Sequence, residues 1–230
     1  METLLLDSAA LADDPYVAWR LQTAEAVFMA GGDQWTYLSL WSGTATQEAL
    51  RGLWERGGAI GGTSAGAAVL GQRAFSAEEG TVYSDEALAD PYNRYMHFDD
   101  DFLALPPLAG VITDTHFYER DRLGRLVTFV ARAIADGQGT PFVGIGVDED
   151  TAVLLDASGS GSVMGSGYAY VVDGQSAPTV CESGQPLSVS DWPYHIVPAG
   201  SSLTLPVVTS TGQERTLSVD AGTLYPANPY

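Results

Sequence analysis

Apolar and polar residues alternate in blocks over the first two thirds of the chain. Compact apolar runs that end at glycine or aspartate predict buried strands at 26–30, 111–114 and 142–147. Between these runs, apolar residues return every three or four positions, which predicts helices at 35–41, 47–56 and 122–136. Strands that alternate with helices in this way predict a mainly parallel sheet with helices on both faces, an α/β sandwich.

Two other stretches have a different pattern of apolar and polar residues. The acidic segment 76–101 holds turn residues without a clear period, and we expect a long surface loop there, beside the candidate site described next. From about residue 151, short apolar runs are separated by Gly, Ser and Pro, which predicts strands joined by turns. We therefore expect a single domain over 1–230, with an α/β part at 1–155 that carries the candidate chemistry and a β-rich part at 156–230.

The segment Gly62-Thr63-Ser64-Ala65-Gly66 matches the pattern G-x-S-x-G at a predicted strand-to-helix junction. Such a turn needs glycines because a β-carbon would strike the adjoining strand or helix. A short helix predicted at 65–70 directs its first backbone N–H groups at an oxyanion that forms on an attacked carbonyl. Ser64 is therefore a candidate nucleophile. The alternative is a Gly- and Ala-rich turn in which the serine only caps a helix.

A serine hydroxyl needs a base to attack at neutral pH, and an imidazole is the usual partner. The chain offers His97, His116 and His195. We favour His116 because it follows a predicted strand, and α/β folds gather active-site residues at the carboxyl ends of strands. His97 lies in the acidic segment and His195 in the β-rich part, where a surface or core role is the simpler interpretation.

The base also needs an acid that fixes its tautomer. Asp148, Glu149 and Asp150 end the predicted strand 142–147, and spacing alone does not separate them. A solvated turn or a helix N-cap is the alternative for this group. The order Ser, His, acid differs from the Ser, acid, His order of α/β-hydrolases, which disfavours an ordinary esterase or lipase.

Three of the ten arginines, Arg120, Arg122 and Arg125, follow His116 closely. Arginine holds a carboxylate bidentately at fixed geometry. This cluster favours capture of a substrate carboxylate near the nucleophile. Ion pairing within the chain is the alternative for part of the cluster, with Glu119, Asp121 or Asp136 as the partners.

The charge balance excludes some partners. The chain has 29 acidic and 10 basic residues, no lysine, and a net charge of −19. This balance disfavours binding to nucleic acid or to anionic membranes. The acidic surface attracts cationic ligands, or it is an adaptation to high salt. The single cysteine, Cys181, excludes a disulfide within the chain and a multi-cysteine metal site.

Several segments together resemble the cyanophycinase-like serine peptidase family S51, which also contains dipeptidase E. They are 31–34 (GGDQ), 62–66 (GTSAG), 114–117 (DTHF) and 144–152 (GIGVDEDTA), in the order of the family. The resemblance implies a three-layer sandwich of the class I glutamine amidotransferase or flavodoxin type, without a cofactor or metal. Relatives carry a further strand, helix and strand before the segment at 3–7, so we expect an N-terminally shortened sheet.

The resemblance also implies roles for individual residues. Ser64 is the nucleophile, His116 the general base and Glu149 the acid, and backbone N–H groups at Gly32 and Ala65 form the oxyanion hole. The residues implied for the substrate pocket are Gln34, Asp114, Thr115, Arg120, Arg122 and Arg125. Thr115 departs from the cyanophycinase pattern, which has glutamine there, and its shorter side chain leaves space or water where an amide would reach the substrate.

From this resemblance we expect a serine-type exopeptidase or isopeptidase that hydrolyses aspartyl or β-aspartyl peptides through an acyl-enzyme. The alternative is a catalytically inactive acidic binding module with the same fold. The expected partner is a peptide with an aspartyl group, not a nucleic acid or a membrane, and a homodimer stays open. A cytoplasmic location is the default expectation, and secretion stays open if a leader precedes Met1.

Overall fold

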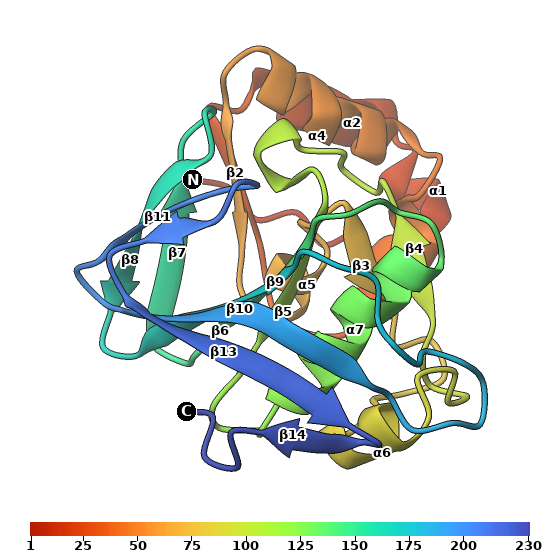
Figure 1. Ribbon diagram of the computed structural model, residues 1–230. Coiled ribbons are helices and arrows are strands. Elements are labelled where there is room, and N and C mark those ends of the chain that lie inside the picture. Colours follow the sequence, from red (N-terminus) through yellow and green to blue (C-terminus); the bar gives the residue numbers. More distant parts are fainter.

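The computed structural model describes residues 1–230, and its largest sheet has eight strands in the order β14-β13-β10-β9-β6-β5-β3-β4 (Figure 1). Its strands are β3 (Arg73–Phe75), β4 (Phe98–Asp100), β5 (Val111–Thr115), β6 (Phe142–Val147), β9 (Tyr168–Gly174), β10 (Val189–Pro198), β13 (Gln213–Asp220) and β14 (Thr223–Tyr225). In this sheet β5 pairs in parallel with β3 and β6, and every other pair is antiparallel.

The prediction of a mainly parallel sheet is therefore wrong, and the fold is a mixed α/β arrangement. A parallel neighbour needs a crossover of a dozen or more residues, whereas an antiparallel neighbour needs only a turn. In the β-rich second part, the strands are joined by turns and loops and no helix lies between them. Its strands β9, β10, β13 and β14 therefore extend the sheet from β6 in the antiparallel sense.

Two smaller sheets and seven α-helices complete the fold. β1 (Ala26–Met29) and β2 (Ala59–Gly62) form a separate parallel pair. A four-stranded antiparallel sheet has the order β12-β11-β8-β7 and consists of β7 (Thr151–Leu155), β8 (Ser160–Gly165), β11 (Ser202–Thr204) and β12 (Thr209–Ser210). The helices are α1 (Ala9–Ala12), α2 (Pro15–Thr23), α3 (Gln34–Trp41), α4 (Ala45–Glu55), α5 (Ala65–Ala68), α6 (Ser84–Ala89) and α7 (Leu123–Ala135), with a 3₁₀ turn at Pro106–Leu108.

The predicted helices at 35–41, 47–56 and 122–136 are confirmed as α3, α4 and α7, with bounds that differ by at most two residues. The helix after Ser64 is a single turn, shorter than predicted. The acidic segment 76–101 is not one long loop, because it contains α6 and β4. The N-terminal helices α1 and α2 were not predicted.

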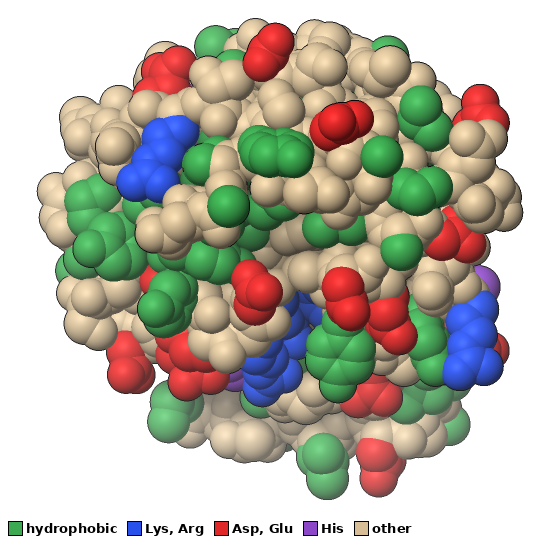
Figure 2. All heavy atoms as spheres, turned by 60° about the horizontal axis from the view of Figure 1, so that its bottom comes forward, with side chains coloured by type: hydrophobic (Ala, Val, Ile, Leu, Met, Phe, Trp, Pro, Cys, Tyr) green, Lys and Arg blue, Asp and Glu red, His purple; other side chains and the backbone are tan.

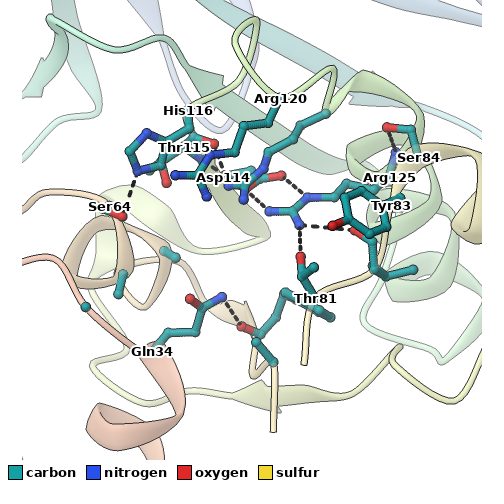
Figure 3. A pocket seen from close by; sticks show the side chains of 17 residues that line it. Gln34, Ser64, Thr81, Tyr83, Ser84, Asp114, Thr115, His116, Arg120 and Arg125 are labelled. Atoms are coloured by element: carbon teal, nitrogen blue, oxygen red, sulfur yellow. Dashed lines mark hydrogen bonds and ion pairs between the residues drawn. The ribbon is translucent and has the colours of Figure 1, made fainter. Parts of the chain in front are cut away.

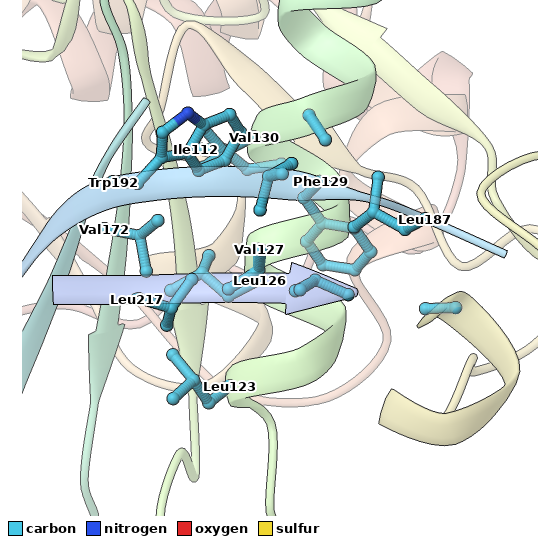
Figure 4. Packing of buried hydrophobic residues seen from close by; sticks show 14 of the residues in the cluster. Ile112, Leu123, Leu126, Val127, Phe129, Val130, Val172, Leu187, Trp192 and Leu217 are labelled. Atoms are coloured by element: carbon cyan, nitrogen blue, oxygen red, sulfur yellow. The ribbon is translucent and has the colours of Figure 1, made fainter. Parts of the chain in front are cut away.

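The core lies on both faces of the large sheet. On one face, the buried helix α7 packs against the strands, and Leu126, Phe129 and Val130 belong to one hydrophobic cluster with Trp192 and Leu217 (Figure 4). On the other face, alternate residues of β6 pack under α2, α4 and the four-stranded sheet. β6 is buried along nearly its whole length, as expected of a strand covered on both sides. None of the helices is long and apolar enough to cross a membrane.

The parallel pairs bring three chain segments to one place. Ser64 follows β2, His116 follows β5, and residues 148–150 follow β6. Thr115 pairs in register with Val147, so the residues after these two strands leave the sheet side by side. The carboxyl ends of parallel strands meet at one edge, where α/β folds place their sites.

Candidate active site

Ser64, His116 and Glu149 form a continuous hydrogen-bonded chain. His116 Nε2 lies 2.8 Å from Ser64 Oγ, and His116 Nδ1 lies 2.6 Å from Glu149 Oε1. Ser64 has φ 52° and ψ −119°, and His116 has φ 50°. A positive φ is unfavourable for both residues, so the surrounding structure must hold these conformations. The arrangement is that of a nucleophile, a base and an acid that orients the base.

The turn that carries Ser64 depends on two glycines. A β-carbon on Gly62 would lie 2.2 Å from the carbonyl oxygen of Gly66, and one on Gly66 would lie 2.3 Å from that of Met29. β2, α5 and the end of β1 therefore approach each other closely enough to exclude any side chain at these positions. Ala65 is the first residue of α5, so its N–H has no preceding helical carbonyl to bind. Ala65 and Gly32 both line the cavity beside Ser64.

The three acids after β6 have different surroundings. Glu149 contacts His116, and its own N–H donates to Glu119 Oε1 at 3.1 Å. Asp148 is buried and accepts backbone N–H groups from Tyr118 and Tyr168, both at 3.0 Å. Burial raises the pKa of Asp148, and the two backbone donors partly offset that effect. Asp148 therefore connects the loops that carry Tyr118 and Tyr168, and Glu149 is the acid that contacts the His116 imidazole, a distinction that spacing in the sequence left open.

A cavity of about 540 Å³ opens beside Ser64 and His116 (Figure 3). Every residue that the resemblance implied for the pocket lines it: Gln34, Asp114, Thr115, Arg120, Arg122 and Arg125. In the space-filling view, arginine side chains gather in a central hollow with acidic side chains around it (Figure 2). The cavity is therefore locally cationic in a strongly acidic molecule.

Asp114 and Arg125 form a buried bidentate pair beneath the cavity. Arg125 Nε lies 2.7 Å from Asp114 Oδ2, and Nη2 lies 2.6 Å from Oδ1. Nη1 of Arg125 donates to Thr81 Oγ1 and to the carbonyl of Val82. Burial alone would raise the pKa of Asp114, but the charges of Arg125 and Arg122 outweigh it and hold that pKa below its ordinary value. Ion pairing therefore occupies Arg125, with Asp114 as the partner rather than Glu119, Asp121 or Asp136.

The other two arginines, Arg120 and Arg122, make fewer hydrogen bonds within the chain than Arg125 does. Arg122 Nη1 donates to the carbonyl of Thr115 at 2.6 Å and to Asp114 Oδ1 at 3.2 Å. Burial lowers the pKa of Arg122 to about 10, against the opposing effect of Asp114, so it stays charged at neutral pH. Arg120 is exposed, and its guanidinium has no hydrogen bond or ion pair within the chain. Gln34 is anchored by a 3.2 Å hydrogen bond from its Nε2 to the carbonyl of Phe75.

The remaining histidines and the cysteine lie outside this site. His97 is exposed and pairs with Glu78 through Nδ1 at 2.9 Å. His195 is buried in β10, 3.2 Å from Ser210 Oγ. Burial raises the pKa of Cys181 to about 11, so it is a thiol at neutral pH.

One wall of the cavity comes from the segment 76–101, which the sequence predicted to lie beside the site, although sequence reasoning did not name its residues. Residues Thr81, Val82 and Tyr83, before α6, and Ser84, its first residue, line the cavity, and Tyr83 and Ser84 lie across it from Ser64 (Figure 3). Ser84 Oγ donates to the carbonyl of Asp121 at 2.5 Å, which ties this wall to the segment before α7. No motif marks these residues, and their place beside Arg125 arises only from the packing of α6 on α7.

Comparisons with known proteins identify the family of the chain. The family model described as Peptidase family S51 matches residues 7–160. A cyanophycinase of Synechococcus elongatus is 30% identical over 210 residues, which cover 89% of this chain and 60% of that protein. A cyanophycinase of Trichormus variabilis is 33% identical over 191 residues, which cover 80% and 58%. The chain thus spans about three fifths of the length of the curated relatives it matches.

A solved structure supports the fold. The crystal structure of a peptidase from an acI-B1 Actinobacterium superposes with a TM-score of 0.56 at 18% identity, and the match covers 86% of this chain and 66% of that one. At this identity the likeness concerns the fold. The family match covers about two thirds of the chain, including the segments that carry Ser64, His116 and Glu149. The chain therefore belongs to peptidase family S51.

Proposed function

We propose that the chain is a serine peptidase that hydrolyses aspartyl or β-aspartyl peptide bonds through an acyl-enzyme. The observation that carries the proposal is the hydrogen-bonded line from Ser64 through His116 to Glu149, at 2.8 and 2.6 Å, beside a cavity with a free guanidinium. Family membership and the cyanophycinase relatives support the same reaction class.

In the first half of the reaction, Ser64 Oγ attacks the scissile carbonyl carbon and its proton passes to His116 Nε2. Glu149 accepts a hydrogen bond from His116 Nδ1 and stabilises the imidazolium that forms. The N–H groups of Gly32 and Ala65 bind the oxyanion. The C–N bond then breaks as His116 gives the proton to the leaving amine.

In the second half, a water molecule attacks the acyl carbon and gives a proton to His116 Nε2. The bond to Ser64 Oγ breaks, the proton returns to the serine, and the aspartyl product leaves as a carboxylic acid. The same residue serves as base and acid in both halves, so no other proton carrier is needed.

The cavity suits the acyl side of an aspartyl bond. An aspartyl residue keeps one free carboxylate whether it is linked through its α or its β carbonyl. Arg120 lines the cavity without a partner, and Arg122 keeps part of its guanidinium unpaired. Guanidinium and carboxylate form strong charge-assisted hydrogen bonds, so these two arginines are the proposed carboxylate clamp. Arg125 and Asp114 support the clamp from below.

The test is turnover of a peptide panel that contains β-Asp-Arg, Asp-Leu and Asn-Leu. The proposal expects cleavage of aspartyl members, loss of at least about a thousandfold in kcat in Ser64→Ala, and little cleavage of the asparagine peptide. Equal turnover in Ser64→Ala would exclude the mechanism. Folded wild-type protein that cleaves no peptide and resists serine-directed probes would favour the inactive acidic binding module instead.

A further inference from the structure

The loop between β5 and α7, residues 116–122, carries three residues of the proposed chemistry. His116 begins this loop, and Arg120 and Arg122 lie near its end. His116 and Asp121 both have a positive φ, 50° and 48°. Such conformations cost free energy in residues other than glycine, so contacts from outside the loop must hold its shape.

Tyr230, beyond β14 in the sequence, supplies two of these contacts through its hydroxyl. The hydroxyl accepts the N–H of Leu123 at 3.1 Å and donates to Asp121 Oδ1 at 2.9 Å. Burial raises the pKa of Tyr230, and the Asp121 carboxylate raises it further, against the effect of the Leu123 N–H. The hydroxyl therefore keeps its proton at neutral pH and makes both hydrogen bonds at once. Tyr230 in this way joins the residues on either side of Arg122.

The start of α7 depends on side chains from other segments. Its N-cap residue, Arg122, makes no side-chain capping bond. The N–H of Leu123 donates to Tyr230, and the N–H of Arg125 donates to Ser84 Oγ at 3.2 Å. The first N–H groups of a helix have no carbonyl partner within the helix. The Tyr230 hydroxyl therefore fixes the point at which the loop enters α7, directly after Arg122.

The ring of Tyr230 contacts the other end of the same loop. It meets Tyr118 and Phe117 edge-on, with ring centroids 5.2 and 6.2 Å apart. Phe117 is fully buried, and its ring stacks on that of Tyr170 with centroids 5.1 Å apart. Phe117 directly follows His116, so this aromatic packing restrains the backbone that carries the base.

The segment that brings Tyr230 to the loop is held by the large sheet. Arg215 Nη1, on β13, lies 3.5 Å from the carbonyl oxygens of both Asn228 and Pro229. Tyr230 thus links the antiparallel strands of the second half of the chain to the loop of the catalytic line. The match to the family model covers residues 7–160 and does not include this contact.

We propose that Tyr230 is a positioning residue for the peptidase reaction, whose hydroxyl holds Arg120 and Arg122 in place and whose ring holds His116 in place. The inference rests on the proposed function, which gives those three residues their roles. Tyr230 does not line the cavity beside Ser64, so it acts through the loop and not on the substrate.

Tyr230→Phe removes the hydroxyl and keeps the ring. The KM for the aspartyl peptide that the wild type cleaves should rise about 3- to 10-fold, because the two hydrogen bonds that hold the arginine end of the loop are lost. The kcat and the rate at which a fluorophosphonate labels Ser64 should stay within about twofold of the wild type. That reagent has no carboxylate and needs only Ser64 and its base.

Tyr230→Leu removes the ring as well as the hydroxyl. The labelling rate of Ser64 and kcat should now also fall, about 3- to 10-fold below those of Tyr230→Phe, because the support of Phe117 and thus of His116 is weakened. Tyr225→Phe is the matched control, since Tyr225 is an exposed tyrosine on β14 that does not line the cavity beside Ser64. It should keep the wild-type KM, kcat and labelling rate.

A role of Tyr230 in folding alone would lower the melting temperatures of the variants and leave the KM and the labelling rate of the folded protein unchanged. That result in an active protein overturns the positioning role and leaves the proposed function intact. If the wild type is labelled but cleaves no peptide, equal labelling rates in the wild type and Tyr230→Leu overturn it. A folded wild type that neither cleaves an aspartyl peptide nor is labelled at Ser64 rejects the proposed function, and the positioning role with it.

Discussion

Arg120 and Arg125 show how two identical side chains in one cluster take different roles. Arg125 is almost fully buried, and Asp114, Thr81 and Val82 bind all of its nitrogens. Arg120 reaches the same cavity from the surface without a partner. A guanidinium without partners can bind a carboxylate at little cost, whereas one in a buried pair would first have to break it.

Arg120→Ala and Arg125→Ala should therefore fail in different ways. Arg120→Ala should lower kcat/KM about 10- to 100-fold, from the loss of one charge-assisted contact, and leave the melting temperature unchanged. Arg125→Ala removes the bidentate partner of buried Asp114, leaves it only the 3.2 Å contact with Arg122 as an ion pair, and should cost about 3–5 kcal/mol of unfolding free energy. Thermal melts and peptide kinetics on both variants check this, and the account is contradicted if Arg120→Ala unfolds the protein or Arg125→Ala leaves its stability intact.

Glu149→Gln should lower kcat without loss of stability. The amide cannot stabilise the imidazolium of His116, and such a change in a Ser-His-acid site costs about 10²–10⁴-fold in kcat. Glu55→Gln is the matched control, because it makes the same chemical change on an exposed residue that does not line the cavity beside Ser64. Steady-state kinetics with circular dichroism on both variants tests the role, and equal rates would remove Glu149 from the mechanism.

At the scale of elements, the position of Ser64 depends on the crossing of β2, α5 and the end of β1. At Gly62 and Gly66 these three backbones approach each other so closely that no β-carbon fits between them. The sequence pattern predicted this turn because few residue combinations permit it. The predicted mainly parallel pairing of the strands was wrong, since a strand such as β9, which is buried along nearly its whole length, fits a parallel or an antiparallel neighbour equally well.

Gly66→Ala should displace the nucleophile. Its β-carbon would lie 2.3 Å from the Met29 carbonyl oxygen, so strands must shift, at a cost of about 1–3 kcal/mol or more. Gly52→Ala, within α4 and with open space around the new methyl group, should instead stabilise the protein by about 0.5–1 kcal/mol. Chemical denaturation and labelling of Ser64 measure both effects. A Gly66→Ala variant as stable and as reactive as the wild type would contradict the account.

At the scale of the whole molecule, the acidic charge and the buried carboxyls set the response to pH. The net charge is −19, so the folded chain repels itself at neutral pH. Burial raises the pKa of Asp99, Asp100 and Asp173 above the ordinary value of 3.8. A raised pKa in the folded state means that stability increases as the pH falls through it. The pKa of Asp114 is instead lowered, because the charges of Arg125 and Arg122 outweigh the effect of its burial.

Stability should therefore pass through a maximum on acidification. From pH 8 towards pH 5 the melting temperature should rise at low salt, because charge repulsion and the raised carboxyls both favour proton uptake in the folded state. Below about pH 4 it should fall, because the unfolded state then binds a proton at Asp114 more readily than the folded state, and the stabilisation that the lowered pKa of Asp114 gives at higher pH is lost. Melts across pH at low and high salt test this. A melting temperature that keeps rising below pH 3 would contradict the role of Asp114.

Much of the site was predictable because its residues lie in local motifs at the ends of strands. Ser64, His116 and Glu149 each follow an apolar run, and the fold brings these ends together. The individual residues of the wall at 81–84 were not predictable, because they depend on how α6 packs on α7, and the pairing of Asp114 with Arg125 depends on how α7 lies against β5. A second cavity, of about 610 Å³, unites residues from six separate segments, from Tyr118 to Tyr230, and no window of sequence contains it.

The central claim is that His116 activates Ser64 as a nucleophile. Covalent labelling by a fluorophosphonate, located by peptide mass spectrometry, tests it most directly. The account predicts modification at Ser64 in the wild type, at least about a hundredfold slower modification in His116→Ala, and none at that peptide in Ser64→Ala. No labelling of folded wild-type protein at Ser64, or equal rates in wild type and His116→Ala, would contradict it.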